Sequence, residues 1–241
     1  MTGRLRAVRD GSMGGMRQAA STRALRRLQA AVPRIRQARR GVPWRVVVIG
    51  EFNAGKTTLI NALLGEALLQ TSVVANTRLV TVVSFAASAR MSLEHCDGTR
   101  ATIDRAMLCP AQAARRLHIA VPHAALKTLC LIDTPGLGVG DVTIERRIRR
   151  ALSRADVVVW CTPAVQAWKA SEQTIWLGLP ERIRKKGILA VTFADAIGSS
   201  GDATRLIARL NAEAGPYFAA IVRMPGIAKA PPRRGGPARA A

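Results

Sequence analysis

The residues with the clearest chemical purpose lie between Gly50 and Thr57, where the chain reads GEFNAGKT. Gly50 and Gly55 let the backbone turn tightly and approach an anion, so that successive N–H groups face it. Lys56 supplies a positive charge to the outer phosphates of a nucleotide, and the hydroxyl of Thr57 is placed to bind Mg²⁺. This stretch predicts a loop that binds a nucleoside triphosphate.

The segments on either side of this loop have the patterns that such a loop requires. An apolar, β-branched run at residues 46–49 is typical of a buried strand in a parallel sheet. Residues 58–64 carry helix formers with apolar positions at helical spacing, and Gly65 ends them. Strand, glycine loop and helix in this order is the context in which the motif binds phosphate.

A second segment with chemical potential, Asp133-Thr134-Pro135-Gly136, follows a predicted strand. A carboxylate at this place helps to hold Mg²⁺ through its water shell, and the N–H of Gly136 can meet a γ-phosphate. The alternative role for Asp133 is to cap the next helix. Thr77 is the candidate for a second Mg²⁺-bound hydroxyl, in a stretch that nucleotide and metal would order. Thr71 is the rival residue for that role.

Composition limits the size and the partners of the protein. The 241 residues are 49% hydrophobic, which suffices for one α/β domain with extensions. The net charge of +22 is concentrated at the ends, with +11 in residues 1–45 and +5 in residues 223–241. Such ends suit RNA or an anionic membrane surface, and the alternative is a bias of composition without a partner.

The cysteines and the hydropathy pattern indicate a location. No CxxC pair and no zinc spacing with histidine occurs among Cys96, Cys109, Cys130 and Cys161, which favours a reducing, cytoplasmic compartment. No apolar run approaches the ~18 residues that span a bilayer. Association with the periphery of a membrane remains open through the basic ends.

The order of the predicted elements defines the fold class. Strands are predicted at 78–85, 91–95, 99–103, 128–133, 156–162, 187–193 and 218–222, and helices at 104–118, 143–154, 170–185 and 203–213. Asp97-Gly98 predicts a hairpin turn. Strands that alternate with helices at this spacing predict a P-loop NTPase fold, a three-layer α/β/α arrangement of a mostly parallel sheet with helices on both faces.

Three blocks of the chain resemble the GTPase domain of bacterial dynamin-like proteins, within the translation-factor-related class of P-loop GTPases. They read GEFNAGKTTLINALLG, ANTRLVTVV and LIDTPGLG, and the stretch from Val157 to Asp195 is similar to the same group. The resemblance covers about residues 44–196 and implies a Mg²⁺-dependent enzyme that converts GTP to GDP and phosphate. About 46 residues follow Asp195, whereas such proteins usually continue into a long helical stalk, so we expect a minimal or truncated GTPase module.

The resemblance also assigns roles to residues. It gives nucleotide contacts to Gly50, Asn53, Ala54, Gly55, Lys56, Thr57, Thr58 and Gly136. It gives catalytic roles to Lys56 and Thr77. It gives Mg²⁺ ligation to Thr57, Thr77 and Asp133.

The base-reading motif of the family is Thr or Asn, Lys, any residue, Asp, and the corresponding segment here is Thr192-Phe193-Ala194-Asp195. The resemblance therefore adds Thr192 and Asp195 to the nucleotide contacts. The carboxylate of Asp195 accepts hydrogen bonds from guanine N1–H and its amino group, a donor pair that adenine lacks. We expect GTP rather than ATP, with a lower affinity because the lysine is missing, and Phe193 can stack on the base.

Two further departures concern hydrolysis. Leu137 stands where many small GTPases have a glutamine that orients water, and Phe52 stands where dynamins often have one. Hydrolysis should be slow unless a homodimer across the nucleotide, a cation or a partner completes the site. The alternatives to a dynamin-like switch are an RNA- or ribosome-associated GTPase, or a degenerate nucleotide-binding module with little hydrolysis.

These observations divide the chain into four predicted parts. They are a disordered basic N-terminus at 1–20, a basic amphipathic helix at 21–42, a P-loop GTPase domain at 43–224 and a disordered basic tail at 225–241. The helix carries an apolar stripe of Leu25, Leu28, Val32 and Ile35 among arginines. Packing of that stripe on the domain and contact with a membrane are its two alternatives.

Overall fold

The computed structural model describes residues 41–69, 79–103, 114–138 and 140–224, together with the single residues Arg26 and Ala30. The predicted basic ends at 1–20 and 225–241, and nearly all of the predicted helix at 21–42, lie outside the described residues. Within the described part, no helix has the length and apolar character needed to cross a membrane.

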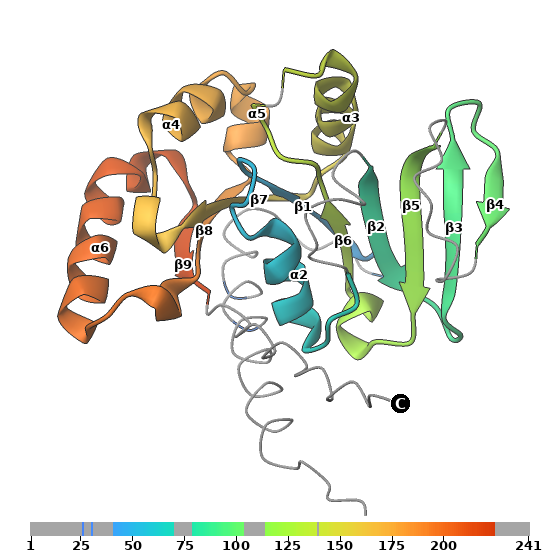
Figure 1. The fold of residues 1–241 in the computed structure, drawn as a ribbon, viewed down its shortest axis with the longest axis horizontal. Coiled ribbons are helices and arrows are strands. Elements are labelled where there is room, and N and C mark those ends of the chain that lie inside the picture. Colours follow the sequence, from blue (N-terminus) through green and yellow to red (C-terminus); the bar gives the residue numbers. More distant parts are fainter. Residues whose placement is uncertain are drawn as a thin grey trace, which may run out of the picture.

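Nine strands form one sheet in the order β4-β3-β5-β2-β6-β1-β7-β8-β9 (Figure 1). Their bounds are β1 Trp44–Ile49, β2 Val80–Phe85, β3 Arg90–His95, β4 Arg100–Thr102, β5 Ala114–Val121, β6 Leu129–Asp133, β7 Val157–Pro163, β8 Gly187–Thr192 and β9 Ala220–Arg223. Five of the eight strand pairings are parallel, and those of β2 with β6 and of β3 with β4 and β5 are antiparallel. The mostly parallel α/β sheet predicted from the sequence is confirmed.

Helices cover both faces of this sheet (Figure 1). They are α2 Lys56–Leu64, α3 Val142–Ser153, α4 Ala170–Leu177, α5 Glu181–Arg184 and α6 Ser200–Glu213. Leu59 and Leu63 of α2 pack in one core with the β1 residues Val46 and Val48. The other helices pack on the opposite face, where Ile148 of α3 shares a second core with several other residues. The alternation of β1 side chains between two cores explains its continuous β-branched run.

Two predicted helices were wrong in part. Residues 114–118 belong to strand β5, where Arg116 and His118 face β2 and β3 and pair on both sides. The alternation of polar and apolar residues over 116–119 is a strand pattern that the charged side chains obscured. The predicted helix at 170–185 is two helices, because Gly178 and Pro180 interrupt it. The predicted hairpin at Asp97-Gly98 is confirmed, and it joins β3 to β4.

The topology decides where a ligand can bind. Strands β6, β1, β7 and β8 are parallel neighbours, so their carboxyl ends lie at the same edge of the sheet. The chain leaves β1 between β6 and β7, at the point where the strand order reverses. Open α/β sheets bind ligands in the crevice outside such a switch point.

A buried carboxylate joins the outer strands. Glu94 of β3 is 3% exposed. It accepts hydrogen bonds from Arg115 Nε at 2.7 Å and Arg100 Nη2 at 3.3 Å, and its Oε2 lies 2.6 Å from His118 Nε2. Burial alone would raise the pKa of Glu94, but the hydrogen bonds of His118 and Arg115 and the charges of Arg115 and Arg116 hold it at about 2.

We expect Glu94→Gln to lower the free energy of unfolding at pH 7 by roughly 2–4 kcal/mol, because the arginines around it would lose their buried counter-charge. The pKa of Glu94 is lower in the folded protein than in the unfolded chain. Its contribution is therefore present above pH 4.5 and lost as the pH falls toward 2. Urea unfolding at pH 7 and pH 3 should show the gap between wild type and variant narrowing at the lower pH.

The matched control for this experiment is Glu181→Gln, at an exposed glutamate that pairs with Lys185 at 2.9 Å. This control should unfold like the wild type at both pH values, because exposed pairs contribute little. Equal stability of Glu94→Gln and wild type at pH 7 would show that the cluster does not hold the outer strands.

Candidate functional site

The loop after β1 is held in shape by close contacts. A Cβ at Gly50 would lie 2.5 Å from the carbonyl oxygen of Cys161, so only glycine lets the loop pass β7 at this distance. Gly55 has φ +79 and immediately precedes α2, which begins at Lys56. The free N–H groups of the first turn of α2 therefore lie next to the loop, which creates an anion site at a helix N-terminus.

Lys56 is 8% exposed and turns back into the loop. Its Nζ donates to the carbonyl oxygens of Glu51 at 2.6 Å and Gly50 at 3.2 Å. Burial lowers the pKa of Lys56, and the negative charges of Asp133 and Glu51 oppose that effect. The loop thus holds a buried ammonium group whose hydrogen-bond partners are backbone oxygens, and a phosphate would supply the missing negative charge.

The first residues of α2 meet the end of β6. Thr57 Oγ1 donates to Asp133 Oδ2 at 2.7 Å. The other carboxylate oxygen of Asp133 is buried and has no hydrogen-bond partner among the described residues. Burial raises the pKa of Asp133 to about 6, although the Thr57 hydrogen bond and the Lys56 charge lower it. Two side-chain oxygens that lie together beside a phosphate loop fit Mg²⁺, which prefers oxygen ligands.

The described residues contain no group of three or more His, Cys, Asp and Glu side chains that could hold a metal ion. A metal at Thr57 and Asp133 would therefore need further oxygens from the nucleotide and water. Mg²⁺ behaves in this way at nucleotide sites, where it keeps several waters.

The segment after β6 lies directly on the phosphate loop. Thr134 Oγ1 donates to the carbonyl oxygen of Val48 at 2.8 Å, and the N–H of Leu137 donates to that of Gly50 at 3.1 Å. A Cβ at Gly136 would lie 2.9 Å from Phe52 Cα. Gly136 therefore allows the two loops to touch.

The end of β8 closes the site from the other side. Thr192 Oγ1 lies 2.9 Å from the carbonyl oxygen of Ala54 and 3.2 Å from that of Thr162. Phe193 has φ +53, and its ring lies 2.9 Å from the place of a Cβ on Gly55. The aromatic residue that stands at the position of the family lysine thus packs on the phosphate loop. Asp195 follows, exposed, in a 3₁₀ turn.

The structure brings most of the predicted site residues to one edge of the sheet. Those that meet there are Gly50, Asn53, Ala54, Gly55, Lys56, Thr57, Thr58, Asp133, Gly136 and Thr192. Asn53 is exposed with φ +58, and Ala54 is buried beneath the loop. Thr77 lies outside the described residues, so its role stays a prediction.

Sequence reasoning missed the contacts of Glu51. Its side chain pairs with Lys169 Nζ at 2.6 Å and accepts a hydrogen bond from Ser171 Oγ at 2.6 Å. These contacts tie the phosphate loop to the start of α4. Nothing in the spacing of Glu51 and Lys169, which are 118 residues apart, could have predicted the pair.

The same helix start contains a fully buried carboxylate, Glu172. It accepts hydrogen bonds from Thr162 Oγ1 at 2.8 Å, the Lys169 N–H at 3.0 Å and Trp160 Nε1 at 3.2 Å. Burial raises the pKa of Glu172, and these hydrogen bonds oppose the shift. Glu172 lies three residues after the N-cap Lys169, at the spacing of a capping box, but a lysine stands where that motif has Ser or Thr, so the sequence did not indicate this role.

Comparison with known proteins places these motifs in a family context. The sequence profile of the Dynamin family matches residues 46–191. The chain is 29% identical over 153 residues to the "Probable transmembrane GTPase FZO-like, chloroplastic" of Arabidopsis thaliana. The aligned region covers 64% of this chain and 15% of that protein. It is 29% identical over 178 residues to the isoniazid-induced protein IniC of Mycobacterium tuberculosis (strain ATCC 25618 / H37Rv), with 70% of this chain and 35% of that protein covered.

A similar solved structure is described as an oligomerised bacterial dynamin pair that provides a mechanism for the long-range sensing and tethering of membranes. It superposes with a TM-score of 0.60 at 15% identity, over 92% of this chain and 47% of that chain. This likeness shows the fold. The chain spans less than half the length of each of these three relatives.

Asp133→Asn tests whether Asp133 takes part in binding a metal ion. In the absence of nucleotide, we expect the free energy of unfolding of the variant at pH 7.5 to exceed that of the wild type by roughly 1–3 kcal/mol, because a partly buried charge is removed. We also expect about 10- to 100-fold weaker nucleotide affinity in Mg²⁺, with little change in EDTA. Chemical unfolding and titration calorimetry measure the two effects.

Asp202→Asn, at an exposed aspartate of α6, is the control and should change neither quantity. A loss of affinity that is equal in Mg²⁺ and in EDTA would assign Asp133 to the shape of the loop instead of to the metal.

Proposed function

This chain belongs to the Dynamin family, and from that premise we propose that it binds GTP with Mg²⁺ and hydrolyses it to GDP and phosphate. The observation that carries the proposal is the hydrogen bond between Thr57 and Asp133 beside the buried ammonium group of Lys56. A metal position and a phosphate position are thereby adjacent, at the edge where the parallel strands end.

In this proposal the phosphates lie in the loop between β1 and α2. The backbone N–H groups of Asn53, Gly55 and Thr58 would bind them together with the N-terminus of α2. The N–H of Ala54, which donates to the carbonyl oxygen of Glu51 at 3.3 Å, would exchange that partner for a phosphate oxygen. Lys56 exchanges its backbone partners for the β- and γ-phosphates and stabilises the charge that develops during transfer. Gly136 lies against Phe52 and can offer its N–H to the γ-phosphate.

Thr57 and Asp133 would hold Mg²⁺, and Thr77 would add a second hydroxyl when the nucleotide is GTP. The metal supplies charge neutralisation between the β- and γ-phosphates when bound. The unpartnered oxygen of Asp133 supports this assignment, since a metal-bound water would give it a hydrogen-bond donor.

Base selection is assigned to Thr192 and Asp195. Asp195 would accept hydrogen bonds from guanine, whereas Thr192 positions the turn by its hydrogen bond to Ala54. The ring of Phe193 already packs on the loop at Gly55, so it is not free to follow a base without moving. We therefore assign Phe193 to loop support more than to base stacking.

Hydrolysis by the isolated chain is proposed to be slow. Phe52 and Leu137, at the positions where related enzymes use glutamine, are apolar and cannot orient water. Glu51 is engaged by Lys169 and Ser171. The nearest atoms to a Cβ on Gly136 all belong to Phe52.

A second copy of the chain, paired across the nucleotide, is the proposed means of completing the site. Two large apolar side chains lie exposed at this edge, Phe52 at 47% and Val165 at 72%. Apolar residues around a ligand site suit a partner surface. The predicted contacts of the basic ends with membrane or RNA, and the predicted cytoplasmic location, stay predictions.

Titration calorimetry tests the nucleotide assignment. With Mg²⁺ present, we expect GTP and GDP to bind in the micromolar range and ATP to bind more weakly. Lys56→Ala should abolish binding, because the buried counter-charge of the phosphates is lost. Asp195→Ala should bring the affinities for GTP and ATP close together. Equal affinities for GTP and ATP in the wild type would contradict the guanine assignment.

Turnover measurements test the pairing. We expect the GTP hydrolysis rate per molecule to rise with protein concentration in the wild type. Val165→Asp should remove that rise and keep GTP affinity, because it places a charge at the apolar edge. Val42→Asp, at an exposed valine on the opposite edge, should behave like the wild type. A rate per molecule that is independent of concentration would argue against the pair.

A further inference from the structure

An acidic side chain lies inside the loop that the proposed function assigns to phosphate. Among residues 50–57, Glu51 is the acidic residue and Lys56 the basic one. The two are neighbours in space, because Lys56 Nζ donates to the carbonyl oxygen of Glu51 at 2.6 Å. Burial lowers the pKa of Lys56, and the charge of Glu51 is among those that oppose this shift. A carboxylate at this place would repel a phosphate unless its charge is neutralised and its direction is fixed.

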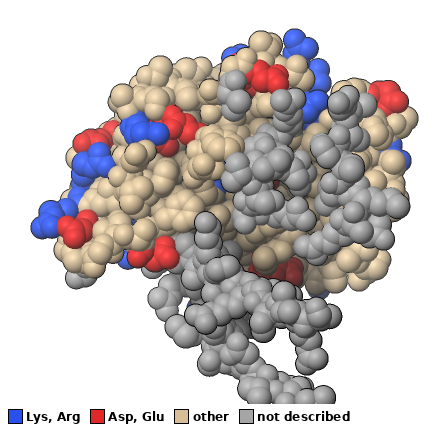
Figure 2. Space-filling model, viewed as in Figure 1, with Lys and Arg blue, Asp and Glu red and all other residues tan. Residues whose placement is uncertain are grey.

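Both oxygens of the Glu51 carboxylate are held by residues at the start of α4. Lys169 Nζ lies 2.6 Å from Oε2, and Ser171 Oγ donates to Oε1 at 2.6 Å. Burial would raise the pKa of Glu51, but the hydrogen bonds with Lys169 and Ser171 hold that pKa below its ordinary value. Figure 2 shows basic and acidic side chains next to one another on the surface near α4. A charge-assisted contact on each oxygen gives the carboxylate a defined direction.

Lys169 extends from a turn that is held at three consecutive residues. The carbonyl oxygen of Ala167 accepts a hydrogen bond from Arg209 Nη2 of α6 at 2.9 Å. The N–H of Trp168 donates to Thr162 Oγ1 of β7 at 2.9 Å. The N–H of Lys169 donates to the buried carboxylate in the first turn of α4 at 3.0 Å. Three elements of the fold therefore fix the backbone from which Lys169 reaches the phosphate loop.

The middle residue of this turn has an unusual backbone conformation. Trp168 has φ +60, a left-handed conformation that bulky residues rarely adopt and that persists where the surroundings enforce it. Its ring packs edge-to-face on Phe218 and on Trp160, with 5.1 Å and 6.4 Å between ring centroids. The aromatic core thus enforces a strained turn, and the side chain that follows it points to Glu51. Strain of this kind is frequent at functional sites.

We propose that Lys169 and Ser171 are positioning residues for nucleotide binding, which act by holding the charged side chain of Glu51 away from the phosphates. This inference rests on the proposed function, because it requires that GTP binds in the loop between β1 and α2. Lys169 neutralises the carboxylate, and Ser171 fixes its second oxygen. Without these contacts the carboxylate can rotate toward the loop and compete with phosphate for Lys56.

Two simpler roles of Lys169 lead to different expectations. If Lys169 bound the phosphates itself, its loss would weaken binding equally whether residue 51 is charged or neutral. If the pair with Glu51 only stabilised the fold, its loss would leave nucleotide affinity unchanged, as for most exposed ion pairs. A double-mutant cycle between positions 51 and 169 distinguishes both roles from the proposal.

Titration calorimetry of the full chain with GTP and Mg²⁺ at pH 7.5 is the test. We expect Lys169→Ala to weaken GTP affinity about tenfold, because the freed carboxylate opposes the triphosphate. In the Glu51→Gln background the same substitution should change the affinity by less than about twofold, since glutamine carries no charge. Lys169→Arg should restore most of the affinity, because it keeps the positive charge. GDP, which has one phosphate fewer, should lose less affinity than GTP.

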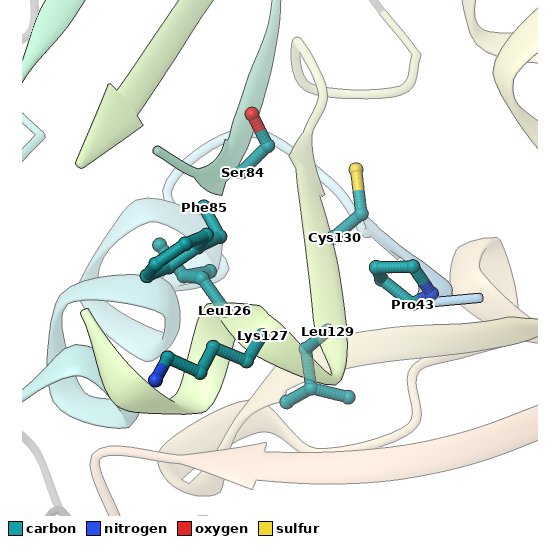
Figure 3. A pocket seen from close by; sticks show the side chains of 7 residues that line it. All are labelled: Pro43, Ser84, Phe85, Leu126, Lys127, Leu129 and Cys130. Atoms are coloured by element: carbon teal, nitrogen blue, oxygen red, sulfur yellow. The ribbon is translucent and has the colours of Figure 1, made fainter. Parts of the chain in front are cut away.

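Two other lysines provide matched controls. Lys185→Ala breaks an exposed ion pair, with Glu181 at 2.9 Å. Lys127→Ala removes a charge in the pocket shown in Figure 3, where Lys127 Nζ lies 5.4 Å from the ring centroid of Phe85. Both lysines precede the amino ends of strands, β8 and β6, whereas the phosphate loop follows the carboxyl end of β1. Both variants should therefore bind GTP like the wild type, and thermal unfolding confirms that every variant is folded.

The outcomes separate this inference from the proposed function. If the wild type does not bind GTP, the proposed function fails and the inference fails with it. If the wild type binds GTP and Lys169→Ala binds it equally well, the inference alone is overturned. An equal loss of affinity in the wild-type and Glu51→Gln backgrounds would also overturn it, and would make Lys169 a direct ligand of the phosphates.

Discussion

The structure depends on the close approach of three backbone segments at the end of β1. Gly50 passes β7, Gly55 lies under Phe193 and Gly136 touches Phe52, each at a distance that a Cβ would prevent. The carbonyl of Gly50 then serves both Lys56 and Leu137. The segments proposed to bind metal, phosphate and base are all positioned by these contacts. The sheet therefore fixes their relative positions, and separate flexible loops do not.

This rigidity has an electrostatic cost that a ligand can remove. Lys56 is buried with backbone oxygens as its hydrogen-bond partners, and Asp133 is partly buried, with its buried oxygen Oδ1 unpartnered among the described residues. Burial shifts the pKa values of these two residues in opposite directions, and in each case the shift disfavours the charged form. A phosphate and a divalent cation bring the two missing opposite charges. Binding of a nucleotide with a cation would therefore lower this electrostatic cost.

The sequence predicted the local part of this arrangement. It did not predict contacts between residues that are far apart in the chain. Strand β1, the loop and α2 follow from one continuous stretch with matching patterns. The strand β5 was mistaken for a helix because its arginines serve Glu94 on the neighbouring strand, a pairing that periodicity does not record. The contact of Glu51 with Lys169 could not be predicted either, because these residues also lie on segments that are distant in the sequence. The packing of Phe193 on Gly55 could not be predicted either, because the two residues are 138 positions apart in the chain.

The site is better built for binding than for turnover, and the fold explains why the two can separate. In the proposed function, binding uses backbone N–H groups, Lys56 and the Thr57–Asp133 pair, all of which lie at the carboxyl ends of β1 and β6. Orienting water requires a polar side chain above Gly136, and the groups nearest to that place, Phe52 and Leu137, are apolar. Phe52 is also 47% exposed, a cost that a solitary domain would avoid by using a polar residue. An exposed aromatic side chain at the position of a missing catalytic group is consistent with a partner surface that covers the ring and brings the polar group with it.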